Sequence, residues 1–202
     1  MEIEVINLGP MGNCTYLLSE GQEALLVDPA WDMNFLEHTL AQKGLNLRAV
    51  FFTHGHFDHV KFSQELLQKH GLKAYLEQHD VLLSGLDPQF LHTYTGAQTV
   101  KEGPFTVEII PTPGHTAGGV CLHIGNAVFT GDTLFPGACG RVDLPSSDPR
   151  EMRKSLVKLS KLPEDTQVFA GHSYGGKCSS TIGYERIKNP FMRNAIRDEE
   201  RL

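Results

Sequence analysis

Cysteine is scarce in this sequence, and no two cysteines stand close together. Cys14, Cys121, Cys139 and Cys178 leave no C-x-x-C spacing, which structural zinc knuckles and thioredoxin-like pairs require. A chain of 202 residues, 40% of them hydrophobic, buries enough apolar surface to fold without disulfides. We therefore expect free thiols in a reducing compartment and one domain spanning residues 1–202.

Long apolar runs and an excess of positive charge are also absent. No stretch approaches the roughly 18 apolar residues of a membrane helix, and the N-terminus MEIEVINLG carries acids where a secretory signal carries bases. The formal net charge of −6 argues against a nucleic-acid-binding protein, which presents a basic face. We expect a cytoplasmic monomer or homodimer whose partner is a small molecule, not a nucleic acid or a membrane.

Short apolar or alternating segments predict strands that come in clusters between helices. The strand pattern occurs at residues 2–8, 14–19, 24–27, 49–52, 73–76, 105–110, 119–124, 127–130 and 167–170. Helical periodicity occurs at residues 32–43, 56–69, 148–162 and 180–188. Phe62 is expected to face inward, and residues 78–98 are expected to hold one short helix and a long loop. This order predicts a layered α/β domain with helices outside the sheets.

One segment concentrates side chains that bind metals. Residues 53–59 read T-H-G-H-F-D-H and directly follow the apolar run at residues 50–52. Imidazole suits zinc and iron, and carboxylate adds negative charge to the ligand set. His54 and His56 on an extended turn can face one point, and Asp58 and His59 at the start of a helix can face a second. Gly55 is expected where the chain turns most sharply.

Three further residues repeat one pattern. His115, Asp132 and His172 each follow a glycine, and the last two also follow apolar strands. Strand ends in an α/β domain hold several side chains rigidly towards one point. A site with two metal ions about 3.5 Å apart needs about this number of ligands. We therefore predict a centre with two metal ions, Zn²⁺ first, with Fe or Mn as alternatives.

These motifs together resemble the metallo-β-lactamase superfamily over almost the whole chain. The resemblance is carried by T-H-G-H-F-D-H, the later single histidine, G-D-T at residues 131–133 and G-H at residues 171–172. It implies an αββα sandwich, two mixed sheets flanked by helices, with metals at the edge between the sheets. It also implies one metal on His54, His56 and His115, another on Asp58, His59 and His172, and a bridge by Asp132.

A narrower resemblance is to the short bacterial members of the glyoxalase II-like branch, which hydrolyse hydroxyacyl thioesters of glutathione. It rests on residues 131–135, which read G-D-T-L-F, and on Gly140 to Asp143. It implies hydrolysis of a thioester such as S-lactoylglutathione by a metal-bound hydroxide, with Asp58 and Asp132 as catalytic residues. Candidates for binding the substrate are Arg141, Tyr174 and Lys177.

The chain ends before the C-terminal helical domain with which full-length glyoxalase II binds glutathione, so a glutathione conjugate stays an open expectation.

Other activities stay open at this point. Persulfide dioxygenases share the metal motifs and the glycine-arginine loop, and they use a single iron at positions equivalent to His54, His115 and Asp132. Against them, Leu144-Pro145 stands where that family favours phenylalanine and glutamine. Hydrolysis of another ester, lactone or phosphoester is also open, because metal ligands alone do not set the substrate. A scaffold without catalysis would tolerate loss of ligands, and this chain has the full set.

Overall fold

Two mixed sheets form the centre of the fold within residues 1–173 and 176–201, which the computed structural model describes. The first sheet has the order β1 (Glu2–Leu8), β2 (Asn13–Glu20), β3 (Glu23–Val27), β4 (Asn46–Phe51), β5 (Ala74–Glu77) and β6 (Leu91–Tyr94). The second has the order β14 (Ser179–Thr181), β13 (Gln167–Ala170), β10 (Ala127–Gly131), β9 (Val120–Ile124), β8 (Phe105–Pro111) and β7 (Gln98–Glu102). A short ribbon pairs β11 (Leu134–Phe135) with β12 (Ala138–Cys139).

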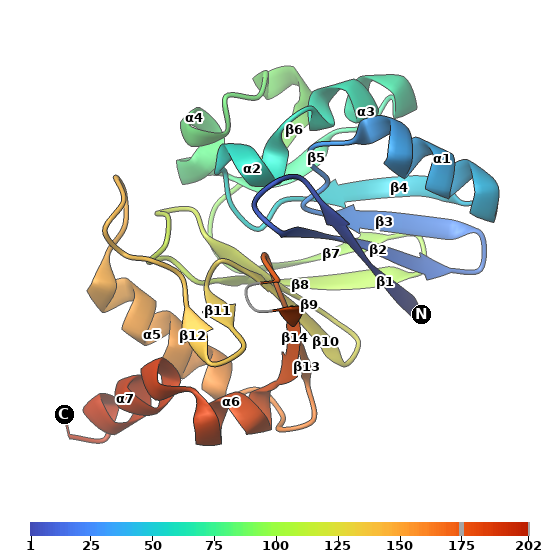
Figure 1. Ribbon diagram of the computed structural model, residues 1–202. Coiled ribbons are helices and arrows are strands. Elements are labelled where there is room, and N and C mark those ends of the chain that lie inside the picture. Colours follow the sequence, from blue (N-terminus) through green and yellow to red (C-terminus); the bar gives the residue numbers. More distant parts are fainter. Residues whose placement is uncertain (174–175, 202) are drawn as a thin grey trace.

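Helices cover the outer face of each sheet (Figure 1). With the first sheet lie α1 (Met33–Lys43), α2 (Phe57–Val60), α3 (Ser63–His70) and α4 (Val81–Ser84), and 3₁₀ turns at Gln78–Asp80 and Pro88–Phe90. With the second lie α5 (Pro149–Ser160), α6 (Ile182–Lys188) and α7 (Pro190–Glu199). The predicted αββα sandwich is therefore confirmed. None of the described helices is both long and apolar enough to cross a bilayer.

Within the described part of the chain, three buried clusters hold the layers together. Tyr16, Phe51 and Phe129 belong to the cluster between the two sheets. Leu66 belongs to the cluster between the first sheet and its helices, and Leu156 to the cluster under α5 and α7. Each fully buried side chain of this size stabilises the fold by about 1.5–3 kcal/mol.

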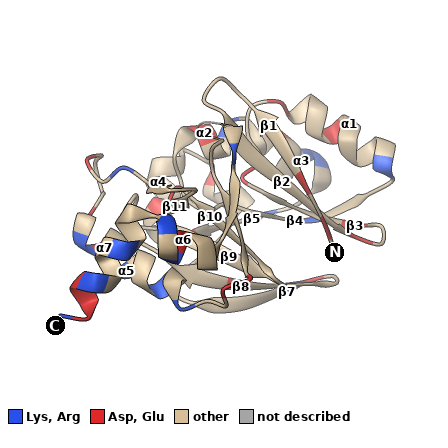
Figure 2. Cartoon of the chain, turned by 60° about the horizontal axis from the view of Figure 1, so that its bottom comes forward, with Lys and Arg blue, Asp and Glu red and all other residues tan. Residues whose placement is uncertain are grey.

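Basic residues are frequent in α5, and α7 carries both basic and acidic residues (Figure 2). Each helix also buries apolar residues, such as Met152 in α5 and Met192 in α7, so both helices are amphipathic.

Two helices replace the single helix predicted at residues 56–69. α2 ends at Val60, and α3 begins at Ser63 after Phe62, whose φ is 67°. The carbonyl of Lys61 accepts a hydrogen bond from the backbone N–H of Trp31 at 3.0 Å and so leaves the helical ladder. The break turns Phe62 outward, where it is 49% exposed, so the predicted inward position was wrong.

Long-range strand pairing also overrides two local predictions. Residues 78–98, expected to hold a long loop, contain β6, which pairs in parallel with β5 from Ala74 opposite Leu91. The C-terminal helix was predicted from residue 180, but β14 occupies residues 179–181 because it pairs with β13. The predicted end of the helix before Pro190 is confirmed, because α6 ends at Lys188. Pro190 also opens a further helix, α7, which the sequence analysis did not predict.

Candidate metal centre

Seven predicted ligands meet at one edge of the sandwich. His54 and His56 follow β4, and the next two ligands lie in α2. The others come from the second sheet: His115 lies between β8 and β9, Asp132 follows β10, and His172 follows β13. Because β10 and β13 are parallel neighbours, their carboxyl ends open at the same edge.

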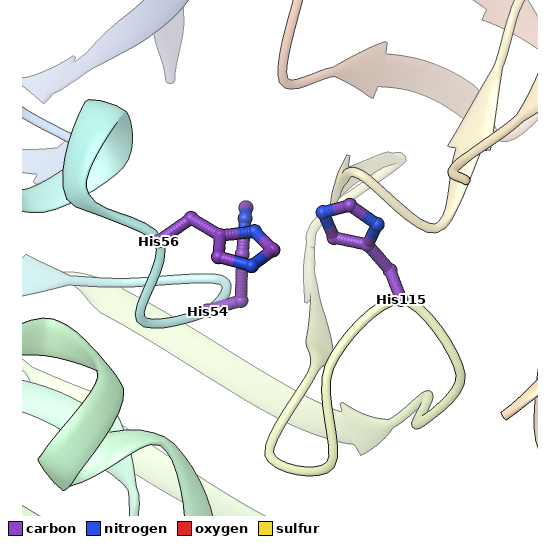
Figure 3. Close-up of side chains that lie close together, drawn as sticks. All are labelled: His54, His56 and His115. Carbon is purple, nitrogen blue, oxygen red and sulfur yellow. The ribbon is translucent and has the colours of Figure 1, made fainter. Parts of the chain in front are cut away.

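Within the described residues, the predicted ligand atoms form two groups, and in each group all of them lie within 4.8 Å of one another. The groups are His54, His56 and His115, and Asp58, His59 and His172. A third group of the same kind joins Asp28 to His54 and His59. Figure 3 shows the first group, in which two rings from one loop and a third from another loop point towards a common space. The ring centroids of His56 and His115 are 4.6 Å apart. This is the division that the family resemblance implies.

Asp132 lies between the two groups. Its Oδ2 is 3.4 Å from Nε2 of His115 in the first group and 3.4 Å from Nε2 of His172 in the second. Its Oδ1 is 3.5 Å from Nε2 of His59. A carboxylate in this position can contact a cation in each group.

Hydrogen bonds at Nδ1 direct the other ring nitrogen of four histidines into the site. The Nδ1 partners are Thr53 Oγ1 for His54 (3.1 Å), Asp28 Oδ2 for His59 (3.0 Å), the Arg141 carbonyl for His115 (2.9 Å) and the Met11 carbonyl for His172 (3.1 Å). An N–H on Nδ1 leaves the Nε2 lone pair for a metal, the usual arrangement of histidine ligands.

Three buried atoms of the site have no hydrogen-bond partner among the residues that the structure describes. They are Nε2 of His54, Nε2 of His115 and Oδ1 of Asp132. A buried acceptor without a partner costs about 1–3 kcal/mol. A divalent cation would satisfy these acceptors, so the residues present fit the metal ions that the sequence predicts.

Electrostatics differs between the two groups. Burial lowers the pKa of His54 well below its usual range and also lowers the pKa of His56. Burial alone would lower the pKa of His172 too, but hydrogen bonds to Asp132 and Asp58 raise it to about 10. Burial raises the pKa of Asp58, yet the hydrogen bond from His172 holds it well below its usual range on balance. Without a cation, His54 and His56 of the first group are therefore neutral at neutral pH, whereas the second group pairs carboxylates with imidazolium.

Asp28 supports the site, although the sequence analysis missed it. It is 3% exposed. Its carboxylate accepts hydrogen bonds from the Thr53 N–H (2.7 Å), the Thr53 hydroxyl (2.6 Å) and His59 Nδ1 (3.0 Å). Asp28 directly follows the apolar strand β3. The rule that selected Asp132 and His172, a polar residue at the end of an apolar strand, would have found it.

Asp80 joins the two loops of the first group and was also missed. It accepts hydrogen bonds from the Gly55 N–H (2.9 Å), the Thr116 hydroxyl (2.6 Å) and the Gly118 N–H (2.8 Å). A Cβ at Gly55 would lie 2.5 Å from the Asp80 carbonyl oxygen, and Gly55 is not among the glycines with positive φ. Close approach to Asp80, not the predicted sharp turn, therefore requires this glycine.

Of the three residues predicted to bind the substrate, the structure describes Arg141 and Lys177. Arg141 belongs to the His115 side of the centre, and its exposed guanidinium pairs with both carboxylate oxygens of Asp143 at 2.7 and 2.9 Å. Lys177 lines a surface hollow of about 490 Å³ together with Gly137 and Tyr184. Tyr174 lies outside the described residues.

Fold and site together define the chain as a metal-dependent hydrolase. The sequence model of the Metallo-beta-lactamase superfamily matches residues 8–172. The chain belongs to the metallo-β-lactamase superfamily.

Three known proteins illustrate the similarity. A hydroxyacylglutathione hydrolase of Tolumonas auensis is 38% identical over 192 residues, which cover 94% of this chain and 73% of that protein. The crystal structure of ETHE1 from Myxococcus xanthus has a TM-score of 0.84 and 27% identity, covering 94% of this chain and 84% of that one. The crystal structure of TTHA1623 in a di-iron-bound form has a TM-score of 0.80 and 32% identity, covering 93% and 99%.

Proposed function

We propose that this protein hydrolyses a thioester such as S-lactoylglutathione at a centre of two divalent cations. One cation would be held by His54, His56 and His115, the other by Asp58, His59 and His172, with Asp132 between them. The placement of Asp132 within 3.5 Å of histidines of both groups carries the proposal of two cations. The choice of a thioester is supported by the likeness to the hydroxyacylglutathione hydrolase. Imidazole and carboxylate ligands suit Zn²⁺, with Fe and Mn as alternatives.

The chain supplies the groups that the reaction needs around the cations. When bound, such cations lower the pKa of a water molecule and polarise a carbonyl oxygen. Asp58 stays ionised, and Asn13 Nδ2 fixes its orientation through a hydrogen bond of 2.9 Å to Oδ2. Asp58 therefore orients the attacking water. The leaving group is a thiol, whose pKa of about 8.5 allows it to leave as thiolate without a general acid.

Hydrolysis of S-lactoylglutathione by the zinc-loaded protein tests the proposal, with His56→Ala as the key variant. His56 is only half-buried, so its loss removes a ligand without opening the core. We expect His56→Ala to lose most of the hydrolysis rate. His79→Ala is the matched control, because the His79 side chain is 64% exposed and lies outside both ligand groups. Hydrolysis at the wild-type rate by His56→Ala would contradict the proposal.

Oxygenation of a persulfide on a single iron is the second candidate, favoured by the structural likeness to ETHE1. Such an iron would be held by His54, His115 and Asp132 and would not need the second group. His172→Ala therefore separates the candidates. Two results together would establish the dioxygenase and exclude the hydrolase. Iron-loaded His172→Ala would take up oxygen with glutathione persulfide, and the wild type would not hydrolyse the thioester.

A further inference from the structure

Three exposed large apolar side chains and the partly exposed Trp31 belong to segments that adjoin or contact the second ligand group. We call Met11, Trp31, Phe57 and Phe62 the apolar rim. Met11 is 43% exposed, Phe57 56% and Phe62 49%. The Trp31 and Phe57 rings meet edge to face at 6.1 Å, and the Lys61 ammonium lies 5.0 Å from the Trp31 ring and 5.1 Å from the Phe62 ring. Single exposed apolar residues are ordinary, but a group of them marks a binding surface.

Hydrogen bonds fix the rim to the metal centre. The Trp31 indole N–H donates to Asn13 Oδ1 at 3.2 Å, and Asn13 Nδ2 donates to the Asp58 carboxylate at 2.9 Å. On the other side, the Met11 carbonyl accepts a hydrogen bond from His172 Nδ1 at 3.1 Å. Hydrogen bonds thus join two of the four rim residues to predicted ligands.

The backbone of the rim is held in conformations that bulky residues rarely adopt. φ is 74° at Trp31 and 67° at Phe62. The Trp31 N–H donates to the Lys61 carbonyl at 3.0 Å, which ties the two strained residues together. The indole also packs on Gly9, where a Cβ would lie 2.4 Å from Nε1. Strain of this kind persists where the surroundings enforce it, and it clusters at binding and active sites.

The two flanks of the centre differ in chemistry. On the first-group flank, the carbonyl of Arg141 accepts a hydrogen bond from His115 Nδ1, and its guanidinium is exposed beside Asp143. On the second-group flank lies the apolar rim. A thioester also has two unlike arms. Its charged thiol carrier suits the flank with the arginine, and its acyl chain suits the rim.

We propose that the apolar rim binds the acyl chain of the substrate, so that the enzyme prefers thioesters with long or aromatic acyl groups to lactoyl thioesters. This inference rests on the proposed thioester hydrolysis and names its acyl class. Each methylene removed from water is expected to raise kcat/KM about fourfold.

Binding without catalysis gives the first test, because Trp31 is the sole tryptophan of the chain and its fluorescence reports on the rim. The zinc-loaded protein is titrated with S-hexylglutathione and with S-methylglutathione, thioethers that have no scissile carbonyl. We expect a shift of emission to shorter wavelength with the hexyl compound alone. Phe57→Ala should weaken the hexyl response, and Phe35→Ala, which changes an exposed phenylalanine (47%) on α1, should not. Equal responses to the two thioethers would overturn the proposal.

Hydrolysis of acetyl, butanoyl and hexanoyl thioesters of glutathione gives the second test. We expect kcat/KM to rise with chain length in the wild type and in Phe35→Ala, and the rise to flatten in Phe57→Ala. Equal kcat/KM for the three thioesters, with no fluorescence shift, overturns the rim assignment and leaves thioester hydrolysis standing. A hexyl-dependent shift without hydrolysis of any thioester supports the rim as an apolar binding site and refutes the proposed function.

Discussion

Asp28→Asn replaces a buried carboxylate that supports both ligand groups. Its oxygens accept hydrogen bonds from the Thr53 N–H, the Thr53 hydroxyl and His59 Nδ1. An amide keeps one acceptor oxygen and places two N–H donors where the carboxylate had its second oxygen. In either orientation at least one buried donor loses its partner, which costs about 1–3 kcal/mol of folding free energy. Loss of a carboxylate that is hydrogen-bonded to a ligating histidine lowers cation affinity about 10- to 100-fold.

Competition with a chromophoric chelator measures the cation affinity, and urea unfolding of the metal-free protein measures the stability. Asp80→Asn is the matched control. Asp80 is also buried and accepts three hydrogen bonds, which come from Gly55, Thr116 and Gly118. We expect both variants to lose a similar free energy of unfolding and Asp28→Asn alone to lose affinity for the cation of the second group. Wild-type affinity in Asp28→Asn would refute this reasoning.

Three other measurements address protons, thiols and packing around the centre. Because the pKa of His172 is about 10 without a cation, its ring is protonated at neutral pH and must release that proton to bind. Affinity at the second group should therefore fall about tenfold for each pH unit between 8 and 6, and calorimetry that finds no change would contradict this. A hydrogen bond from a neighbouring thiol lowers the pKa of Cys178 to about 6, whereas burial raises that of Cys139 to about 11. Iodoacetamide at pH 7 should modify Cys178 first by mass spectrometry, and equal rates would disprove the difference. A Cβ at Gly171 would lie 2.4 Å from Asp132 Oδ1. Metal analysis of Gly171→Ala should therefore find fewer bound cations than in the wild type. Full cation occupancy would count against so close an approach of Gly171 to Asp132.

The fold was predictable wherever local pattern and tertiary structure agree. The helix beginning near Asp148 was found because an acidic N-cap and a proline at the first position precede an apolar stripe, and Asp148 does cap α5. β6 was missed because its pairing with β5, and not its composition, makes it a strand. The break after α2 was missed for a similar reason, since the contact between Trp31 and Lys61 joins residues far apart in the sequence.

The candidate site likewise contains residues that local patterns predict and residues that they miss. Dense motifs placed the seven predicted ligands, because histidines and aspartates at strand ends converge when the strands are neighbours. Among the residues that orient them, Asp28 stands at a strand end like the ligands, but Asn13 and Asp80 depend on contacts that no local pattern reports. Asn13 reaches Asp58 across 45 positions, and Asp80 reaches Gly118 across 38. Sequence patterns detect a metal-binding side chain that stands in a typical local position, and only folding brings supporting partners such as Asn13 and Asp80 into contact with the site.

The most direct test of the two-cation hydrolase is a titration of metal-free protein with Zn²⁺ while the hydrolysis of S-lactoylglutathione is followed. The arrangement of two ligand groups on either side of Asp132 predicts that the rate rises until two equivalents are bound and then stays constant. A rate that is complete at one equivalent, or absent at two, would contradict the proposed function.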